Sequence, residues 1–150
     1  MKIFVKLKGW FLSFFREGFL YHYSSLEFRA KLLAAMIAID KKIDECEEKI
    51  LQEIASQIYK NNEARVYVLI NTTKEYVDKV IQKNGLDLNE LILEIDKDLK
   101  KVKRFYKKIN IQQLEKFLEC SKDNEEKQIT QKHVLEFLQN QIDEHNKSNV

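Results

Sequence analysis

Five carboxylates lie within one short segment and form the densest set of oxygen ligands in the sequence. They are Asp40, Asp44, Glu45, Glu47 and Glu48. Oxygen ligands of this kind suit Ca²⁺ or Mg²⁺, so Asp40, Asp44 and Glu47 are candidate metal ligands. The alternative is structural. Asp44 and Glu47 have the spacing of a capping box, while Glu45 and Glu48 would complement the positive end of a helix dipole.

A second group of residues that could bind a ligand is basic. Seven cations fall between residues 97 and 108: Lys97, Lys100, Lys101, Lys103, Arg104, Lys107 and Lys108. Most recur at helical spacing, and Lys97, Lys101, Arg104 and Lys108 are the candidate anion site. Their ligand would be a phosphate on a lipid headgroup or nucleic acid, although no nucleic-acid-binding motif accompanies them. The alternative is the solvated face of an amphipathic helix.

Cysteine and histidine offer little catalytic chemistry. Cys46 and Cys120 are the only cysteines, and without a secretory context we expect free thiols in a reducing, cytoplasmic compartment. His22, His133 and His145 are isolated from one another, so no local zinc motif exists. Because no nucleophile–base pair can be identified either, we expect a protein that is not an enzyme.

Residues 1–20 predict an amphipathic, aromatic-rich helix. Its apolar side consists of Phe4, Leu7, Trp10, Phe11, Phe14 and Phe15. Lysines opposite such a side are typical of a helix that lies in a membrane interface. Packing against the chain's own bundle and homodimerisation remain alternatives. The apolar runs are shorter than the ~20 residues of a membrane span.

The remaining sequence predicts helices throughout. Proline is absent and only three glycines occur, which disfavours turn-rich β architectures. Ser24 is expected to cap a buried helix at residues 26–39. Asp44, either Asp87 or Asn89, and Asn110 are further expected caps. These features predict an all-α, compact bundle of six or seven helices.

Four local details are also predicted. The helix at residues 66–83 has a potential break near residues 71–73. The helix that starts at Asp87 or Asn89 should continue as far as Phe105 or Tyr106. Residues 121–128 are expected to form a polar loop, with Thr130 capping the last helix. The tail from His145 is expected to fray.

The segment Ala34-Ala35-Met36-Ile37-Ala38-Ile39-Asp40-Lys41-Lys42-Ile43-Asp44-Glu45-Cys46-Glu47 resembles the repeat unit of the TerB-like, tellurite-resistance family. Asp40, Ile43, Asp44 and Glu47 match that family's motif, whereas Lys41 replaces its glycine. A weaker second copy covers residues 117–142.

The resemblance to the TerB-like family has consequences for fold and function. It implies a TerB-like domain at residues 24–145 with two pseudo-repeated helical pairs and no established enzymatic activity. It also implies a stress-response role in which the domain binds a partner protein or a divalent metal ion, Ca²⁺ or Mg²⁺. The alternative function is a peripheral membrane adaptor at the inner-membrane surface, which would use the helix at residues 1–20 and the basic residues. Nucleic acid is the least favoured partner.

Overall fold

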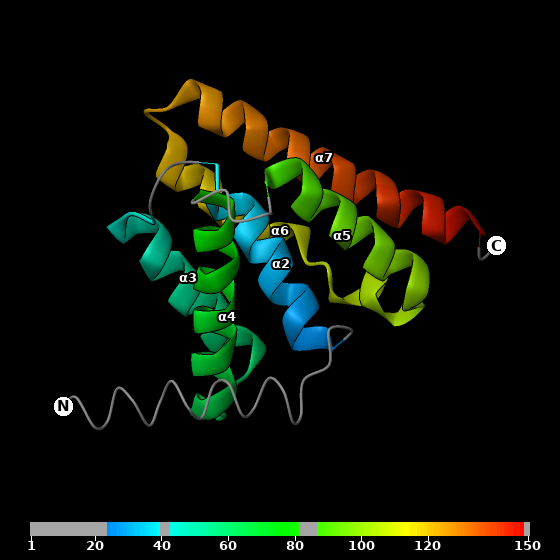
Figure 1. Cartoon of the computed structure of the whole chain (residues 1–150), viewed down its shortest axis with the longest axis horizontal. Helices are drawn as coiled ribbons and strands as arrows, with labels where there is room; N and C mark the ends of the chain where they lie inside the picture. The colour runs from blue at the N-terminus through cyan, green and yellow to red at the C-terminus, as the bar shows by residue number, and fades with distance from the viewer. Residues whose placement is uncertain (1–23, 40–42, 82–86, 149–150) are drawn as a thin grey trace.

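The computed structural model describes residues 24–39, 43–81 and 87–148, and these residues form an all-α bundle, as predicted (Figure 1). The elements are α2 (Ser25–Ile37), α3 (Glu45–Ile58), α4 (Glu63–Ile81), α5 (Leu88–Lys101), the 3₁₀ helix η1 (Lys103–Lys108), α6 (Ile111–Glu115), the 3₁₀ helix η2 (Lys116–Ser121) and α7 (Glu125–Ser148). No strand occurs among these residues. The predictions for residues 1–20, Asp40 and His22 lie outside them.

Helix α2 is the centre of the bundle. It packs against α4, α5, α7 and η1, and Figure 1 shows it surrounded by the other helices. Eleven of its 13 residues are buried, which confirms the prediction from its nearly continuous apolar sequence. The helix begins where predicted, because the Ser24 hydroxyl accepts a hydrogen bond from the Glu27 amide at 3.1 Å.

Three other predicted caps are confirmed. Asp44 begins α3, Asp87 begins α5 and Asn110 begins α6, and each side chain accepts a hydrogen bond from the backbone N–H three residues later. Each of these contacts satisfies an amide that the helix itself leaves unpaired. The side chains therefore fix where three elements start.

The predicted break at residues 71–73 is wrong, since α4 is continuous. Two of the polar side chains in this segment bond within the helix. The Asn71 amide donates to the Tyr67 carbonyl at 2.9 Å, and the Thr73 hydroxyl donates to the Leu69 carbonyl at 2.8 Å. These residues favour turns when their side chains compete with helical hydrogen bonds, and here they bond one turn back along the helix instead.

The predicted continuation of α5 as far as Phe105 or Tyr106 is also wrong. Helix α5 ends at Lys101, Val102 is extended with φ −127° and ψ 91°, and the 3₁₀ helix η1 follows. This change of direction buries Phe105, which stacks on Phe28 of α2 with ring centroids 4.6 Å apart. The basic residues after Lys101 therefore do not follow the α-helical spacing that was used to predict the anion site.

The last helix is longer than predicted at both ends. The polar-loop prediction fails for residues 125–128, because α7 begins at Glu125. Asn124 accepts a hydrogen bond from the Lys127 amide at 3.1 Å, in the position of a cap. Thr130 is no cap, since its hydroxyl donates to the Glu126 carbonyl inside the helix. The expected fraying from His145 is likewise wrong, because α7 continues to Ser148.

Buried polar contacts link elements that are far apart in sequence. Lys31 of α2 pairs with Asp98 of α5 at 2.8 Å, and Lys127 of α7 pairs with Glu47 of α3 at 2.9 Å. Gln131 of α7 donates to the Met36 carbonyl at 2.9 Å. Such contacts specify which helices pack together, because a buried charge without its partner is strongly destabilising.

Candidate functional site

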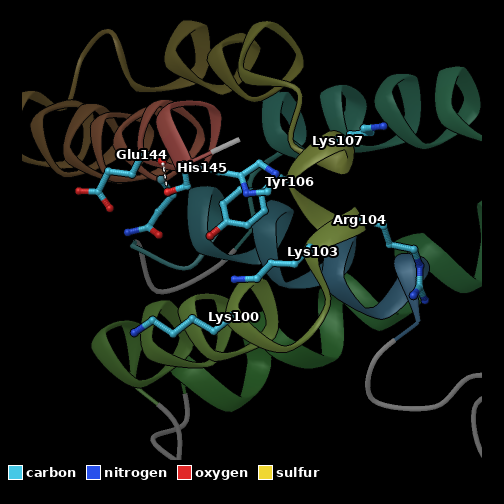
Figure 2. Close-up of a pocket in the computed structure, with 9 residues that line it drawn as sticks. Lys100, Lys103, Arg104, Tyr106, Lys107, Glu144 and His145 are labelled. Atoms are coloured by element: carbon cyan, nitrogen blue, oxygen red, sulfur yellow. Dashed lines mark hydrogen bonds between the residues drawn. The ribbon is translucent and has the colours of Figure 1, made fainter. Parts of the chain in front are cut away.

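A basic hollow lies between η1, the end of α5 and the C-terminal part of α7. Its volume is about 570 Å³. Lys100 of α5 and three cations of η1 line it, and α7 contributes the opposite wall (Figure 2). The lining residues are Lys100, Lys103, Arg104, Tyr106, Lys107, Gln141, Glu144, His145 and Ser148. The turn at Val102 is what brings the η1 side chains against α7.

The charges around this basic hollow are only partly balanced. Asp96 pairs with Lys100 at 2.8 Å, and this hydrogen bond raises the pKa of Lys100. Glu144 is the one carboxylate among the lining residues. Neither Lys103 nor Lys107 forms an ion pair with any described residue, and both are exposed. Two of the four lining cations therefore lack a compensating carboxylate, which favours an anionic ligand.

An aromatic pair forms the floor between the cations. The rings of Tyr106 and His145 stack with centroids 3.9 Å apart and planes 4° apart. Figure 2 shows the pair at the centre of the group, with Lys100 and Lys103 on one side. Burial, followed by the charges of Asp96 and Glu144, raises the pKa of Tyr106. A phenol is protonated near neutral pH even without this shift, so Tyr106 can donate a hydrogen bond to an anion.

The structure brings only one of the four predicted anion-binding residues to the basic hollow. Arg104 lines it, while Lys97 and Lys101 are exposed on α5 and Lys108 lines a separate crevice beside Arg29. The other lining cations, Lys100, Lys103 and Lys107, belong to the same basic segment but are not among the four predicted residues. Tyr106 and His145 were not predicted at all as part of this site. Because η1 is not α-helical, spacing by 3.6 residues could not select the right cations.

The acidic segment uses its carboxylates for structure. Asp44 and Glu47 form the predicted capping box, with Glu47 Oε1 accepting from the Asp44 amide at 3.2 Å. Glu47 Oε2 accepts from Lys127 Nζ at 2.9 Å. Both Glu47 oxygens are thus engaged, and Glu48 pairs with Lys74 at 2.6 Å. The structural alternative is confirmed as far as the cap is concerned, whereas Ca²⁺ or Mg²⁺ binding with Asp40 stays a prediction.

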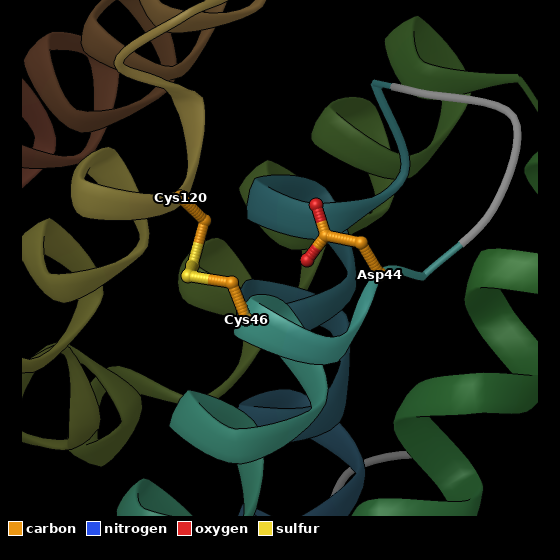
Figure 3. A group of neighbouring side chains, drawn as sticks. All are labelled: Asp44, Cys46 and Cys120. Atoms are coloured by element: carbon orange, nitrogen blue, oxygen red, sulfur yellow. A yellow bond between two sulfur atoms is a disulfide. The ribbon is translucent and has the colours of Figure 1, made fainter.

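The prediction of free thiols is wrong. Cys46 in the first turn of α3 and Cys120 in η2 form a disulfide, with Cα atoms 5.6 Å apart (Figure 3). The pair spans 74 residues of sequence. The disulfide could not be predicted from local sequence, because the packing of η2 on α3 brings the two cysteines together. Disulfides are typical of oxidising compartments, so the cytoplasmic location stays a prediction.

Fold and site together define an all-α protein with a basic surface hollow and one disulfide among the described residues. No model of a known protein family matches the chain, and no curated protein or solved structure is significantly similar to it. Among the described residues, none of the helices has both the length and the apolar character needed to cross a membrane. Function must therefore be argued from the site.

Proposed function

We propose that this chain is a non-enzymatic helical domain that docks on an anionic membrane surface through the basic hollow. The observation that carries the proposal is the convergence of Lys103, Arg104 and Lys107 of η1 with Lys100 of α5 around one hollow. Phosphate oxygens of lipid headgroups would accept hydrogen bonds from these cations and from the neutral Tyr106 phenol.

The sequence of residues 1–20 supports a membrane as the source of the phosphate groups. That segment combines lysines with six large apolar side chains at helical spacing, which is typical of interfacial helices. A single weak contact rarely holds a protein at a membrane, and stable anchoring takes two signals. An apolar segment together with a basic site would supply both.

A binding role is favoured over a catalytic one by the state of the lining groups. The Tyr106 phenol is protonated at neutral pH, as in an ordinary tyrosine, and burial raises its pKa further, so it offers a hydrogen-bond donor rather than a nucleophile. The Ser148 hydroxyl donates to the Glu144 carbonyl, within α7. The stress-response setting implied by the TerB-like resemblance, with a protein partner or divalent ion, remains a further proposal that rests on the motif at residues 34–47.

Vesicle sedimentation tests the membrane proposal. Each lysine near an anionic surface contributes about 1 kcal/mol, so replacing Lys103 and Lys107 together by Gln should weaken binding about 30-fold. The matched control replaces Lys97 and Lys132 by Gln, because both are exposed and lie outside the hollow. We expect the control variant to sediment with anionic vesicles almost as well as the wild type does. Neither the wild type nor the control variant should sediment with neutral vesicles.

Three results would contradict the membrane proposal. One is the absence of sedimentation with anionic vesicles at low salt, where exposed charges are least screened. Another is equal loss of binding in the control and in the hollow variant, which would mean that overall charge decides. The third is retardation of RNA or DNA that depends on Lys103 and Lys107 without any vesicle binding, which would identify nucleic acid as the ligand.

A further inference from the structure

We propose that reduction of the Cys46–Cys120 disulfide creates a binding site for a thiophilic divalent cation, with Asp44 as the third ligand. The site lies on α3 and η2 and shares no residue with the basic hollow. The inference is therefore independent of membrane binding. Zn²⁺ is the probe whose chemistry fits these donors best.

The geometry already gathers the three donors. One ligand atom each from Asp44, Cys46 and Cys120 lies within 4.8 Å of the others. Figure 3 shows the Asp44 carboxylate beside the sulfur pair, on the same side of the α3 start. In a tetrahedral zinc site, sulfur and oxygen ligands are about 3.6–3.8 Å apart. Side-chain rotation alone could therefore bring the freed sulfurs and the carboxylate to these separations.

Asp44 has an oxygen to spare. Its Oδ1 accepts the capping hydrogen bond from the Glu47 amide at 2.8 Å. Its Oδ2 receives no hydrogen bond from any described residue. Asp44 can therefore keep its capping role and offer the second oxygen to a cation. This distinguishes it from Glu47, whose two oxygens are both engaged.

The surroundings favour a cation once the thiols are free. Cys46 lies in the first turn of α3, where the helix dipole stabilises a thiolate. Cys46 is exposed and Cys120 is half-buried, so a reductant can reach the disulfide.

The chemistry balances with a dithiol as the reductant. The dithiol transfers two electrons and two protons, which breaks the Cys46–Cys120 bond and leaves two thiols and an oxidised, cyclic disulfide reductant. The metal ion then displaces both thiol protons to solvent and binds two thiolates and the Asp44 carboxylate. Water fills the fourth position, as in zinc sites with three protein ligands. A small disulfide reverses the process: it accepts two electrons from the thiolates and two protons from solvent, is reduced to two thiols, re-forms the Cys46–Cys120 bond and releases the ion.

Metal titration of the full chain tests this site. The protein is reduced, the reductant is removed without air, and Co²⁺ or Zn²⁺ is added. We expect one ion per reduced chain, a thiolate-to-cobalt charge-transfer absorption, and a higher unfolding temperature in the presence of Zn²⁺. The oxidised chain should show none of these changes. Circular dichroism before and after addition reports whether the reduced chain is helical.

Variants identify the ligands. The single variants Cys46→Ser and Cys120→Ser should each lose the charge-transfer band that the site with both thiolates gives. Both variants lack the disulfide, as the reduced chain does. Asp44→Asn keeps a capping oxygen but loses the charge, and it should weaken Zn²⁺ binding at least about tenfold. Glu45→Gln is the matched control, since it removes a neighbouring carboxylate outside the donor group, and it should leave affinity within about twofold.

Four outcomes overturn the proposal. The first is a reduced chain that binds no Zn²⁺, and the second is an oxidised chain that binds it equally well. The third is wild-type affinity in Asp44→Asn, which would remove the third ligand. The fourth is Zn²⁺ binding to a reduced chain that has lost its helices, without restoring them. That last result would show that the fold does not assemble the site.

Discussion

Removing the disulfide should destabilise the protein by an amount that the length of the closed loop sets. Cys46 and Cys120 are 74 residues apart, and a cross-link over that length lowers the entropy of the unfolded chain. The chain-entropy relation gives about 15 cal/mol/K, or about 4.5 kcal/mol at 25 °C. For a domain of ordinary stability, about 5–15 kcal/mol, this is between about three-tenths and nine-tenths of the total.

Urea unfolding of the Cys46→Ser, Cys120→Ser double variant measures this contribution. The variant should unfold at a markedly lower urea concentration than the oxidised wild type, with a free energy of unfolding lower by about 4.5 kcal/mol. Its m value should rise, because the unfolded chain without the cross-link exposes more surface. The unfolding temperature should fall by roughly 9–18 °C. Reduced wild type is the matched control and should behave like the double variant.

The result that refutes this reasoning is a double variant within about 1 kcal/mol of the oxidised wild type. If thiol titration in denaturant then finds both cysteines free in the wild type, the disulfide itself is absent. If it finds the cysteines bonded, the loop constraint must be offset by strain in the native state or by structure that persists in the unfolded chain.

Three further predictions concern contacts that position the helices. Asn124→Ala should lower the free energy of unfolding by about 1 kcal/mol, and Thr130→Ala by less than half of that, measured by urea unfolding. A larger loss in Thr130→Ala than in Asn124→Ala would mean that Thr130 is the cap. Asp98→Ala should cost about 3–5 kcal/mol because it strands Lys31 in the core, and a cost under 1 kcal/mol would mean that water reaches the lysine. Burial raises the pKa of Glu47 in the folded state. The contribution of Glu47 to stability is therefore greatest below about pH 4.5 and falls as the pH rises. Glu47→Gln should flatten this pH dependence in unfolding experiments from about pH 4 to 7.

Features encoded over three or four residues could be predicted from the sequence. The caps Ser24, Asp44, Asp87 and Asn110 are confirmed because a cap depends on one side chain and an amide three residues later. The burial of α2 is confirmed because an apolar helix surface has to be covered. Asn124 could also have been predicted, since Glu125 and Glu126 follow it and favour a helix start.

The candidate site depended on features that local patterns do not encode. The extended residue Val102 ends α5 and thereby changes which cations share a surface. A prediction from helical periodicity fails here, because it assumes that no such residue interrupts the helix. The stacking of Tyr106 on His145 joins residues from two separate elements. The disulfide requires that η2 pack on α3, which is a property of the tertiary fold. In each case the missing information was the relative position of distant segments.

Two long-range links meet at one junction between the start of α3 and the region from η2 to α7: the disulfide, which spans 74 residues, and the Glu47–Lys127 ion pair, which spans 80. The Gln131 hydrogen bond to Met36, which spans 95 residues, ties α7 to the end of α2. Glu47 adjoins Cys46 in sequence, so whatever loosens the sulfur pair also affects the burial of the ion pair. Because a buried pair loses its value when water enters, the redox state of the cysteines should influence how firmly α7 is held. A metal ion on Asp44, Cys46 and Cys120 would replace the disulfide's link between α3 and η2 at the same position, so metal binding should stabilise the reduced chain at this junction.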